Sequence, residues 1–178
     1  MTCIVGLVDN EKVYIGGDSA GVAGLNLCKR ADEKVFRNGD FIMGFTTSFR
    51  MGQLLRYDFV PPKRYPDVDI YKYMVTEFIN EVRSCLKRGG YAEKDKDVES
   101  GGTFLVGYSG RLFTIEGDYQ VGENIYPFDS CGCGFPFALG SLYSSKSNPD
   151  PECRVVLALK AAQEFSAGVS EPFHIEVL

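Results

Sequence analysis

The sequence of 178 residues contains a single histidine and has no long run of apolar residues. No segment approaches the roughly 20 apolar residues that a membrane-spanning helix needs. The first residues also lack a basic segment followed by an apolar one, which is the pattern of a secretory signal. Basic residues are in the minority, and the net charge of −5 argues against a nucleic-acid or anionic-membrane partner. These features predict a cytoplasmic protein.

Patterns that bind metals are also missing. Six cysteines occur, but the one close pair is Cys131-Gly-Cys133, and the lone histidine, His174, lies near the C-terminus. A Cys-x-Cys pair without further ligands does not make a zinc site. In a reducing compartment we expect six buried or half-buried thiols in place of disulfides. The sequence therefore implies no metal and no cofactor.

What the sequence does contain fits one globular domain over residues 1–178. Hydrophobic residues make up 44% and charged residues 24%, which is close to the average for soluble globular proteins. A chain of this length can bury one core without disulfide support. We find no internal repeat and no linker, so a single domain is expected.

Strand and helix patterns follow one another in groups along the chain. Asn38-Gly39 and Ser109-Gly110 are typical of tight turns between strands, and residues 91–100 are expected to form a mobile loop. The fold class predicted from this order is α+β, a four-layer αββα sandwich of two stacked antiparallel sheets flanked by helices. Strands are predicted at 2–8, 13–17, 33–36, 41–45, 101–108, 111–116, 121–126 and 173–178, and helices at 49–59, 71–88, 135–143 and 152–168.

The second residue, Thr2, has two interpretations. It is an ordinary second residue, or, if Met1 is removed, it carries a free α-amine beside its own hydroxyl, which makes a nucleophile with a built-in base. An α-amine has an unperturbed pKa of roughly 7.7–8.0, so a useful fraction is unprotonated near neutral pH. A nearby cation lowers that pKa, and a carboxylate can hold the cation in place. Lys34 and Asp18 are the candidates for these two groups.

These residues together resemble a known family. Thr2, Gly17-Asp18, Lys34-Val35 and Met43-Gly44-Phe45 are similar to the motifs of the N-terminal nucleophile hydrolases of the proteasome β-subunit and HslV peptidase type. The resemblance covers most of the chain and is densest in residues 2–60. It implies the four-layer fold and a threonine-type peptidase, an amide-bond hydrolase. It also implies that Met1 is all that has to be removed to expose Thr2.

The resemblance implies roles for individual residues. Thr2 Oγ would attack the scissile carbonyl, and its amine would accept the proton. Lys34 would tune that amine, and Asp18 would orient Lys34. The backbone N–H of Ser48 would stabilise the oxyanion, and Cys133 would replace a serine near the amine with a weaker donor. The substrate side-chain pocket would be walled by Gly21, Asp32, Phe36, Thr46 and Arg50.

Two features of this set differ from the family or leave a question open. An acid and a base in one pocket leave its polarity undecided. The family also has an Asp and a Ser three residues apart near the end of its last long helix. This chain has Gln163 and Ser166 there, so the carboxylate is missing unless Glu164 replaces it.

The resemblance further implies a homo-oligomeric ring with its sites facing an inner chamber, polypeptide substrates and an ATPase unfoldase as partner. Two alternatives stay open. An amine could take up the same acyl-threonine intermediate, which would make the protein a transpeptidase or ligase. A chain that retains Met1 would have an amide in place of the amine, and it would be a non-catalytic scaffold or assembly subunit, a reading that Cys133 and Gln163 favour.

Overall fold

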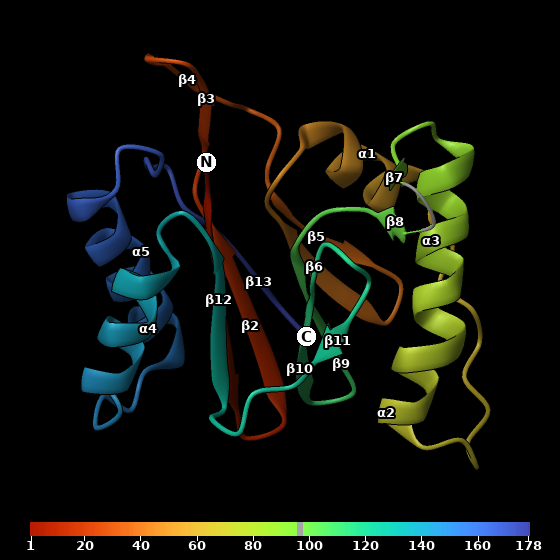
Figure 1. Ribbon diagram of the computed structural model, residues 1–178. Helices are drawn as coiled ribbons and strands as arrows, with labels where there is room; N and C mark the ends of the chain where they lie inside the picture. The colour runs from red at the N-terminus through yellow and green to blue at the C-terminus, as the bar shows by residue number, and fades with distance from the viewer. Residues whose placement is uncertain (96–97) are drawn as a thin grey trace.

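The computed structural model describes residues 1–95 and 98–178. Two antiparallel sheets lie face to face, and helices cover the outer face of each. In Figure 1 the four layers follow one another from α4 and α5, through the two sheets, to α1, α2 and α3. The predicted αββα sandwich is confirmed.

The first sheet has the strand order β12-β1-β2-β13. Strands β1 (Cys3–Asp9) and β2 (Lys12–Gly17) form the predicted N-terminal hairpin. Strand β13 (His174–Val177) pairs with β2, and β12 (Phe128–Gly132) pairs with β1. Strand β12 was not predicted, because its Asp, Ser and Gly residues are more typical of turns. The N-terminal hairpin is therefore central in its sheet, flanked by strands from the second half of the chain.

The second sheet has the order β11-β10-β9-β6-β5 and is antiparallel throughout. The strand predicted at 121–126 is shorter than expected, because Asn124 Oδ1 accepts the N–H of Tyr126 in a turn. The strands of this sheet are β5 (Val35–Asn38), β6 (Phe41–Phe45), β9 (Phe104–Tyr108), β10 (Arg111–Ile115) and β11 (Val121–Gly122).

Two hairpins lie outside these sheets. Strands β3 (Ala20–Ala23) and β4 (Asn26–Lys29) form a ribbon that projects beyond the sandwich close to the N-terminus (Figure 1). Strands β7 (Glu93–Asp95) and β8 (Val98–Ser100) fall within the segment predicted to be a mobile loop. The prediction of a loop was wrong for these strands. Their backbone N–H and C=O groups are satisfied by pairing with each other, and the polar sequence of the segment shows no strand pattern. The predicted loop also included residues 96–97, which lie outside the described residues.

The helical layer over the second sheet begins with α1 (Phe49–Tyr57), which is capped by Ser48. The helix predicted over 71–88 starts as α2 (Ile70–Tyr73) and ends as α3 (Ile79–Arg88), with a π-helical turn, η1 (Met74–Phe78), between them. Two further helices lie over the first sheet, and the second of them, α5, ends three residues before residue 168, where its end was predicted. These are α4 (Phe135–Ser144) and α5 (Pro151–Phe165).

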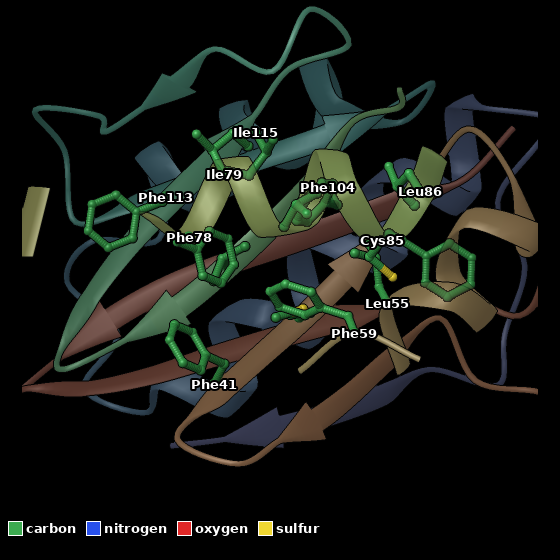
Figure 2. Close-up of a cluster of buried hydrophobic side chains, with 14 of the residues drawn as sticks. Phe41, Leu55, Phe59, Phe78, Ile79, Cys85, Leu86, Phe104, Phe113 and Ile115 are labelled. Atoms are coloured by element: carbon green, nitrogen blue, oxygen red, sulfur yellow. The ribbon is translucent and has the colours of Figure 1, made fainter. Parts of the chain in front are cut away.

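Apolar side chains fill the space between every pair of layers. The layer under α1 to α3 is rich in aromatic residues, as the side chains of Phe41, Phe59, Phe78, Phe104 and Phe113 in Figure 2 show. The layer between the sheets is aliphatic and contains Ile4, Ile15, Val35, Ile42 and Leu105. Within the described part of the chain, no helix is long and apolar enough to cross a membrane.

The cysteines differ from the expectation in one respect. All six are free thiols in the described structure, and Cys3, Cys85 and Cys131 are buried. Cys28 and Cys133 are exposed, although all six thiols were expected to be at least half-buried. Cys28 lies on the projecting ribbon and Cys133 in the turn between β12 and α4. Their exposure thus follows from tertiary position, which the apolar flanking sequence does not reveal.

Candidate active site

Thr2 lies directly before the central strand β1, and its side chain is buried. Its Oγ1 donates a hydrogen bond of 2.5 Å to the Met1 carbonyl. Met1 is 55% exposed, and its Cβ lies so close to Gly168 that a Cβ added there would approach it to 2.3 Å. In the chain of residues 1–178 the Thr2 nitrogen is therefore a peptide N–H, and Met1 is the accessible residue in front of it.

Asp18 and Lys34 form a buried ion pair beside the start of β1. Each is 1% exposed, and Lys34 Nζ lies 2.9 Å from Asp18 Oδ1. The same oxygen accepts the N–H of Cys3 at 2.9 Å. The other carboxylate oxygen accepts the N–H groups of Ala20 at 2.8 Å and Ser170 at 3.3 Å. Asp18 thus ties Lys34 to the backbone on both sides of the first hairpin and to the C-terminal segment.

Local sequence explains why these two charges lie together. Asp18 directly follows Gly17, the last residue of β2, and Lys34 directly precedes β5. The two residues therefore lie at strand ends, one in each of the two stacked sheets. Burial lowers the pKa of the Lys34 ammonium, and the Asp18 carboxylate opposes that effect. The buried ammonium is held in place by its ion pair with Asp18. It can lower the pKa of an amine placed next to it.

On its other side Thr2 contacts Cys133. The Thr2 N–H donates to Cys133 Sγ at 3.3 Å, and the thiol lies 3.4 Å from the Thr2 carbonyl oxygen. The thiol also lies 3.2 Å from Ser166 Oγ. The predicted position of Cys133 near the Thr2 nitrogen thus agrees with the geometry, and Ser166 joins it there.

Gly132 allows this close approach. Its φ is +96°, and a Cβ at this position would lie 2.3 Å from the Thr2 carbonyl oxygen. Any other residue would be strained by the backbone conformation and would collide with the chain at Thr2. The glycine before Cys133 therefore sets the distance between the β12–α4 turn and the N-terminus.

Ser48 has a different environment from the one its predicted role requires. Its N–H donates to the Thr46 carbonyl oxygen at 2.7 Å, across a turn in which Thr47 has a φ of +63°. Its side-chain oxygen accepts the N–H of Arg50 and caps α1. For the Ser48 N–H to bind an oxyanion, this turn has to open.

Gln163 does not face the thiol. Its Oε1 accepts the N–H of Glu171 at 2.7 Å, while the neighbouring Glu164 is exposed. Of the pair predicted from the family pattern, Ser166 is the residue next to Cys133. The amide of Gln163 ties the end of α5 to the C-terminal segment, and Glu164, the residue that could replace the missing carboxylate, is exposed.

Among the cavities formed by residues 1–95 and 98–178 that the structure describes, Gly21 and Arg50 belong to separate ones, and the other three residues predicted to wall the substrate pocket have other surroundings. Phe36 is 1% exposed and belongs to the aromatic core. Asp32 accepts two hydrogen bonds of 2.7 Å from Arg30, and Thr46 Oγ1 accepts the N–H of Thr47. Gly21 and Arg50 line two different cavities.

Several groups around the site were not predicted. The N–H donors of Cys3, Ala20 and Ser170 to Asp18 belong to the backbone, which carries no signal in the sequence. Arg30 and Phe49 were also missed. The guanidinium of Arg30 lies 4.2 Å from the centroid of the Phe49 ring, and this ring is 5.7 Å from Lys34 Nζ. Arg30 and Phe49 lie far apart along the chain, so no local sequence pattern identifies their contact.

Comparisons with known proteins identify the fold. No protein-family model and no curated protein sequence matches this chain. Among solved structures, a match is BPH of Thiobacillus denitrificans, a bacterial proteasome homologue, whose structure is in complex with epoxomicin. The TM-score is 0.81, and the identity is 24% over 99% of this chain and 97% of that one.

Two further structures give the same result. HslV from Trypanosoma brucei matches with a TM-score of 0.69 and 18% identity, covering 99% of this chain and 98% of that one. Anbu, an ancestral β-subunit from Yersinia bercovieri, has a TM-score of 0.67 and 15% identity over 99% of this chain and 81% of its own. The layers, the central N-terminal strand and these likenesses together show that the chain has the proteasome-like fold of the N-terminal nucleophile hydrolases.

Proposed function

We propose that this protein is a threonine-type peptidase whose nucleophile is Thr2, exposed by removal of Met1. The observation that carries the proposal is the buried Asp18–Lys34 pair, whose carboxylate accepts the N–H of Cys3, the residue directly after Thr2, within a proteasome-like fold. Structural neighbours of the same fold support a subunit that assembles into a ring, and we propose a polypeptide substrate on the same ground.

The chemistry follows from the groups around Thr2. Once Met1 is gone, the amine takes the proton from Thr2 Oγ as this oxygen bonds to the scissile carbonyl carbon, and the carbonyl oxygen becomes an oxyanion. The intermediate collapses, the C–N bond breaks, and the leaving nitrogen takes the proton. Water then attacks the resulting ester, gives a proton to the amine and releases the acid, which regenerates Thr2 Oγ–H.

Lys34 and Cys133 act on the amine in this scheme. The ammonium of Lys34 lowers the pKa of a neighbouring amine and so raises the fraction that can accept a proton at neutral pH. Asp18 positions Lys34 through the 2.9 Å ion pair. Cys133, which lies 3.3 Å from the Thr2 nitrogen, orients that nitrogen through its sulfur. The amide of Ser48 becomes an oxyanion donor when its turn opens.

The test compares chains that start at Thr2 with chains that keep Met1, verified by intact mass. We expect hydrolysis of an unfolded protein and of fluorogenic peptides by the chain that starts at Thr2. The Thr2→Ala variant should lose about 10³-fold or more in kcat/KM, whereas Thr2→Ser, which keeps both amine and hydroxyl, should retain activity. Full activity of a folded Thr2→Ala variant contradicts the threonine mechanism.

The alternative functions have distinct outcomes in the same assay. Product analysis with an added amine acceptor separates transfer from hydrolysis, because a ligase would yield the amide of the acceptor. The bond from Gln163 to Glu171 in place of a carboxylate near Cys133 favours the scaffold alternative. A folded chain that starts at Thr2, assembles and hydrolyses nothing would establish that alternative.

A further inference from the structure

A cavity of about 320 Å³ lies between the β3–β4 ribbon and the start of α1. Most of its wall is apolar and comes from Val22, Ala23, Leu27 and Phe49, and the rest of the wall is formed by Gly21, Asn26, Cys28 and Arg30. The volume falls within the range of pockets that hold small ligands. A leucine or phenylalanine side chain has the size and the chemistry that such walls accommodate.

The cavity is next to the groups around Thr2. The ring of Phe49, one of its walls, lies 5.7 Å from Lys34 Nζ. Gly21, another wall, directly follows Ala20, whose N–H binds Asp18 at 2.8 Å. A peptide whose scissile carbonyl is at Thr2 therefore has this cavity beside one of its side chains.

Arg30 lies over the cavity, and its charge is paired with Asp32. Its stem lies against Gly21, where an added Cβ would be 3.0 Å from Arg30 Cγ. Its guanidinium stacks 4.2 Å from the Phe49 ring centroid and donates twice to Asp32 at 2.7 Å. The opposite charges of this partly exposed pair offset each other, and the guanidinium carbon of Arg30 lies over the Phe49 ring.

The other base predicted for the pocket points elsewhere. Arg50 donates to the Gly89 carbonyl at 3.3 Å and lines a different cavity of about 680 Å³ together with Arg88. Neither Asp32 nor Arg50 therefore offers an unpaired charge to the cavity at Phe49.

We propose that this cavity selects an apolar side chain of the substrate, with Phe49 as its contact wall and the Arg30–Asp32 pair as a neutral cover. A leucine or phenylalanine residue gains apolar burial against Phe49. A charged residue would lose its hydration without finding an opposite charge that is free to pair with it. The inference rests on the proposed peptidase function and names the class of residue that the site prefers.

The kinetic test uses fluorogenic peptides that differ only in the residue before the cleaved bond, which is Leu, Phe, Glu or Arg. We expect kcat/KM for Leu and Phe to exceed that for Glu and Arg by about tenfold or more. Phe49→Ala should reduce this preference about tenfold. The matched control is Tyr57→Ala on the same helix, because Tyr57 is exposed and lies outside this cavity.

The charge test uses the two halves of the pair. Arg30→Met keeps a stem of similar length and frees the Asp32 carboxylate, so the Arg peptide should improve relative to the Glu peptide. Asp32→Asn frees the Arg30 guanidinium, so the opposite shift is expected. Preference of the parent chain for Glu or Arg, or unchanged selectivity in both variants, overturns the inference.

A binding measurement separates this inference from the proposed function. The same peptides, as C-terminal amides, are titrated into the Thr2→Ala chain and followed by saturation-transfer NMR, which needs no hydrolysis. Stronger binding of the Leu and Phe peptides, reduced by Phe49→Ala, supports the inference even if no chain hydrolyses a peptide. Equal or inverted binding overturns it while the threonine mechanism can still stand.

Discussion

The ion pair on one side of Thr2 and the thiol on the other differ in burial and in the number of their partners. Asp18 and Lys34 are each 1% exposed, and Asp18 accepts three backbone N–H groups besides the ammonium. Cys133 is exposed, and its partners are the Thr2 backbone and Ser166. One region is closed and saturated with hydrogen bonds, and the other is open and weakly bonded.

Because of this difference, we expect the buried ion pair to determine folding stability and the exposed thiol to affect the reaction. A buried charge is tolerated when all of its partners are present, so the Asp18–Lys34 side permits a single arrangement. A thiol at the surface is a weak hydrogen-bonding group that can change with little cost to folding. We expect substitutions on the closed side to affect folding most, and those on the open side to affect the reaction alone.

The largest effect is expected for Asp18→Ala. It removes the carboxylate, leaves the Lys34 ammonium buried without a partner and orphans three backbone N–H groups, at a cost of about 3–5 kcal/mol in the free energy of unfolding. Chemical denaturation followed by circular dichroism measures this. The control is the exposed Asp67→Ala, expected within about 0.5 kcal/mol of the parent. A loss for Asp18→Ala as small as that of the control would mean that the region is not closed.

Lys34→Met should cost less, about 1–3 kcal/mol, because Asp18 keeps its three backbone donors. The same denaturation experiment tests this, and the order of the two variants is the informative result. The chain that starts at Thr2 should hydrolyse more slowly at neutral pH with Lys34→Met, and its pH–rate profile should move to higher pH as the amine pKa rises. An unchanged profile would argue that Lys34 does not tune the amine.

A pH titration of stability tests the closed side through Cys3. Burial raises the pKa of the Cys3 thiol to about 12 from its ordinary value near 9. The folded state then holds a proton that the unfolded chain releases, so this contribution is complete below pH 9 and is lost as the pH rises from 9 towards 12. Relative to Cys3→Ala, the parent should lose about 1 kcal/mol by pH 10. A constant difference between the two chains over that range would contradict burial of the thiol.

The smallest effect on folding is expected for Cys133→Ser, within about 0.5 kcal/mol. Serine is a stronger hydrogen-bonding group than cysteine and has Thr2 and Ser166 within reach. Hydrolysis by the chain that starts at Thr2 should therefore rise a few-fold, measured as kcat at fixed pH. A loss of folding stability as large as that of Asp18→Ala would show that both sides of Thr2 are equally closed, and the contrast would fail.

The sequence predicted most of the fold because its strongest patterns are local. The hairpin of β1 and β2, the turn at Asn38-Gly39 and the helices α1, α4 and α5 follow from apolar periodicity and turn residues. Strand β12 and the β3–β4 ribbon were missed, because each is stabilised by pairing with a partner strand and carries little apolar periodicity of its own. The π-helical turn η1 has no sequence pattern that distinguishes it from the α-helix around it.

The candidate site was predicted in part for the same reason. The resemblance grouped Asp18, Lys34 and Cys133 with Thr2. In the structure Cys133 contacts the Thr2 nitrogen, and Asp18, paired with Lys34, binds the N–H of the following residue, Cys3. The resemblance did not place the Arg30–Asp32 pair or the Phe49 stack, and Arg50, which it grouped with Gly21, lines a different cavity from Gly21. A sequence motif shows which residue types are present and where strands end. The direction of a side chain depends on contacts with residues that are distant in the chain.

By itself, the sequence determined the chemistry available at the N-terminus, a hydroxyl and a nitrogen on Thr2 with one carboxylate and one ammonium at strand ends. The tertiary structure alone decided which of these groups are excluded from water, which charges are paired and which thiol is exposed. Burial and pairing depend on contacts between strands, ribbon and helices that are far apart along the chain. The strength of a charge or a nucleophile is set by these contacts, because each one changes the solvent and the electrostatic field around the group.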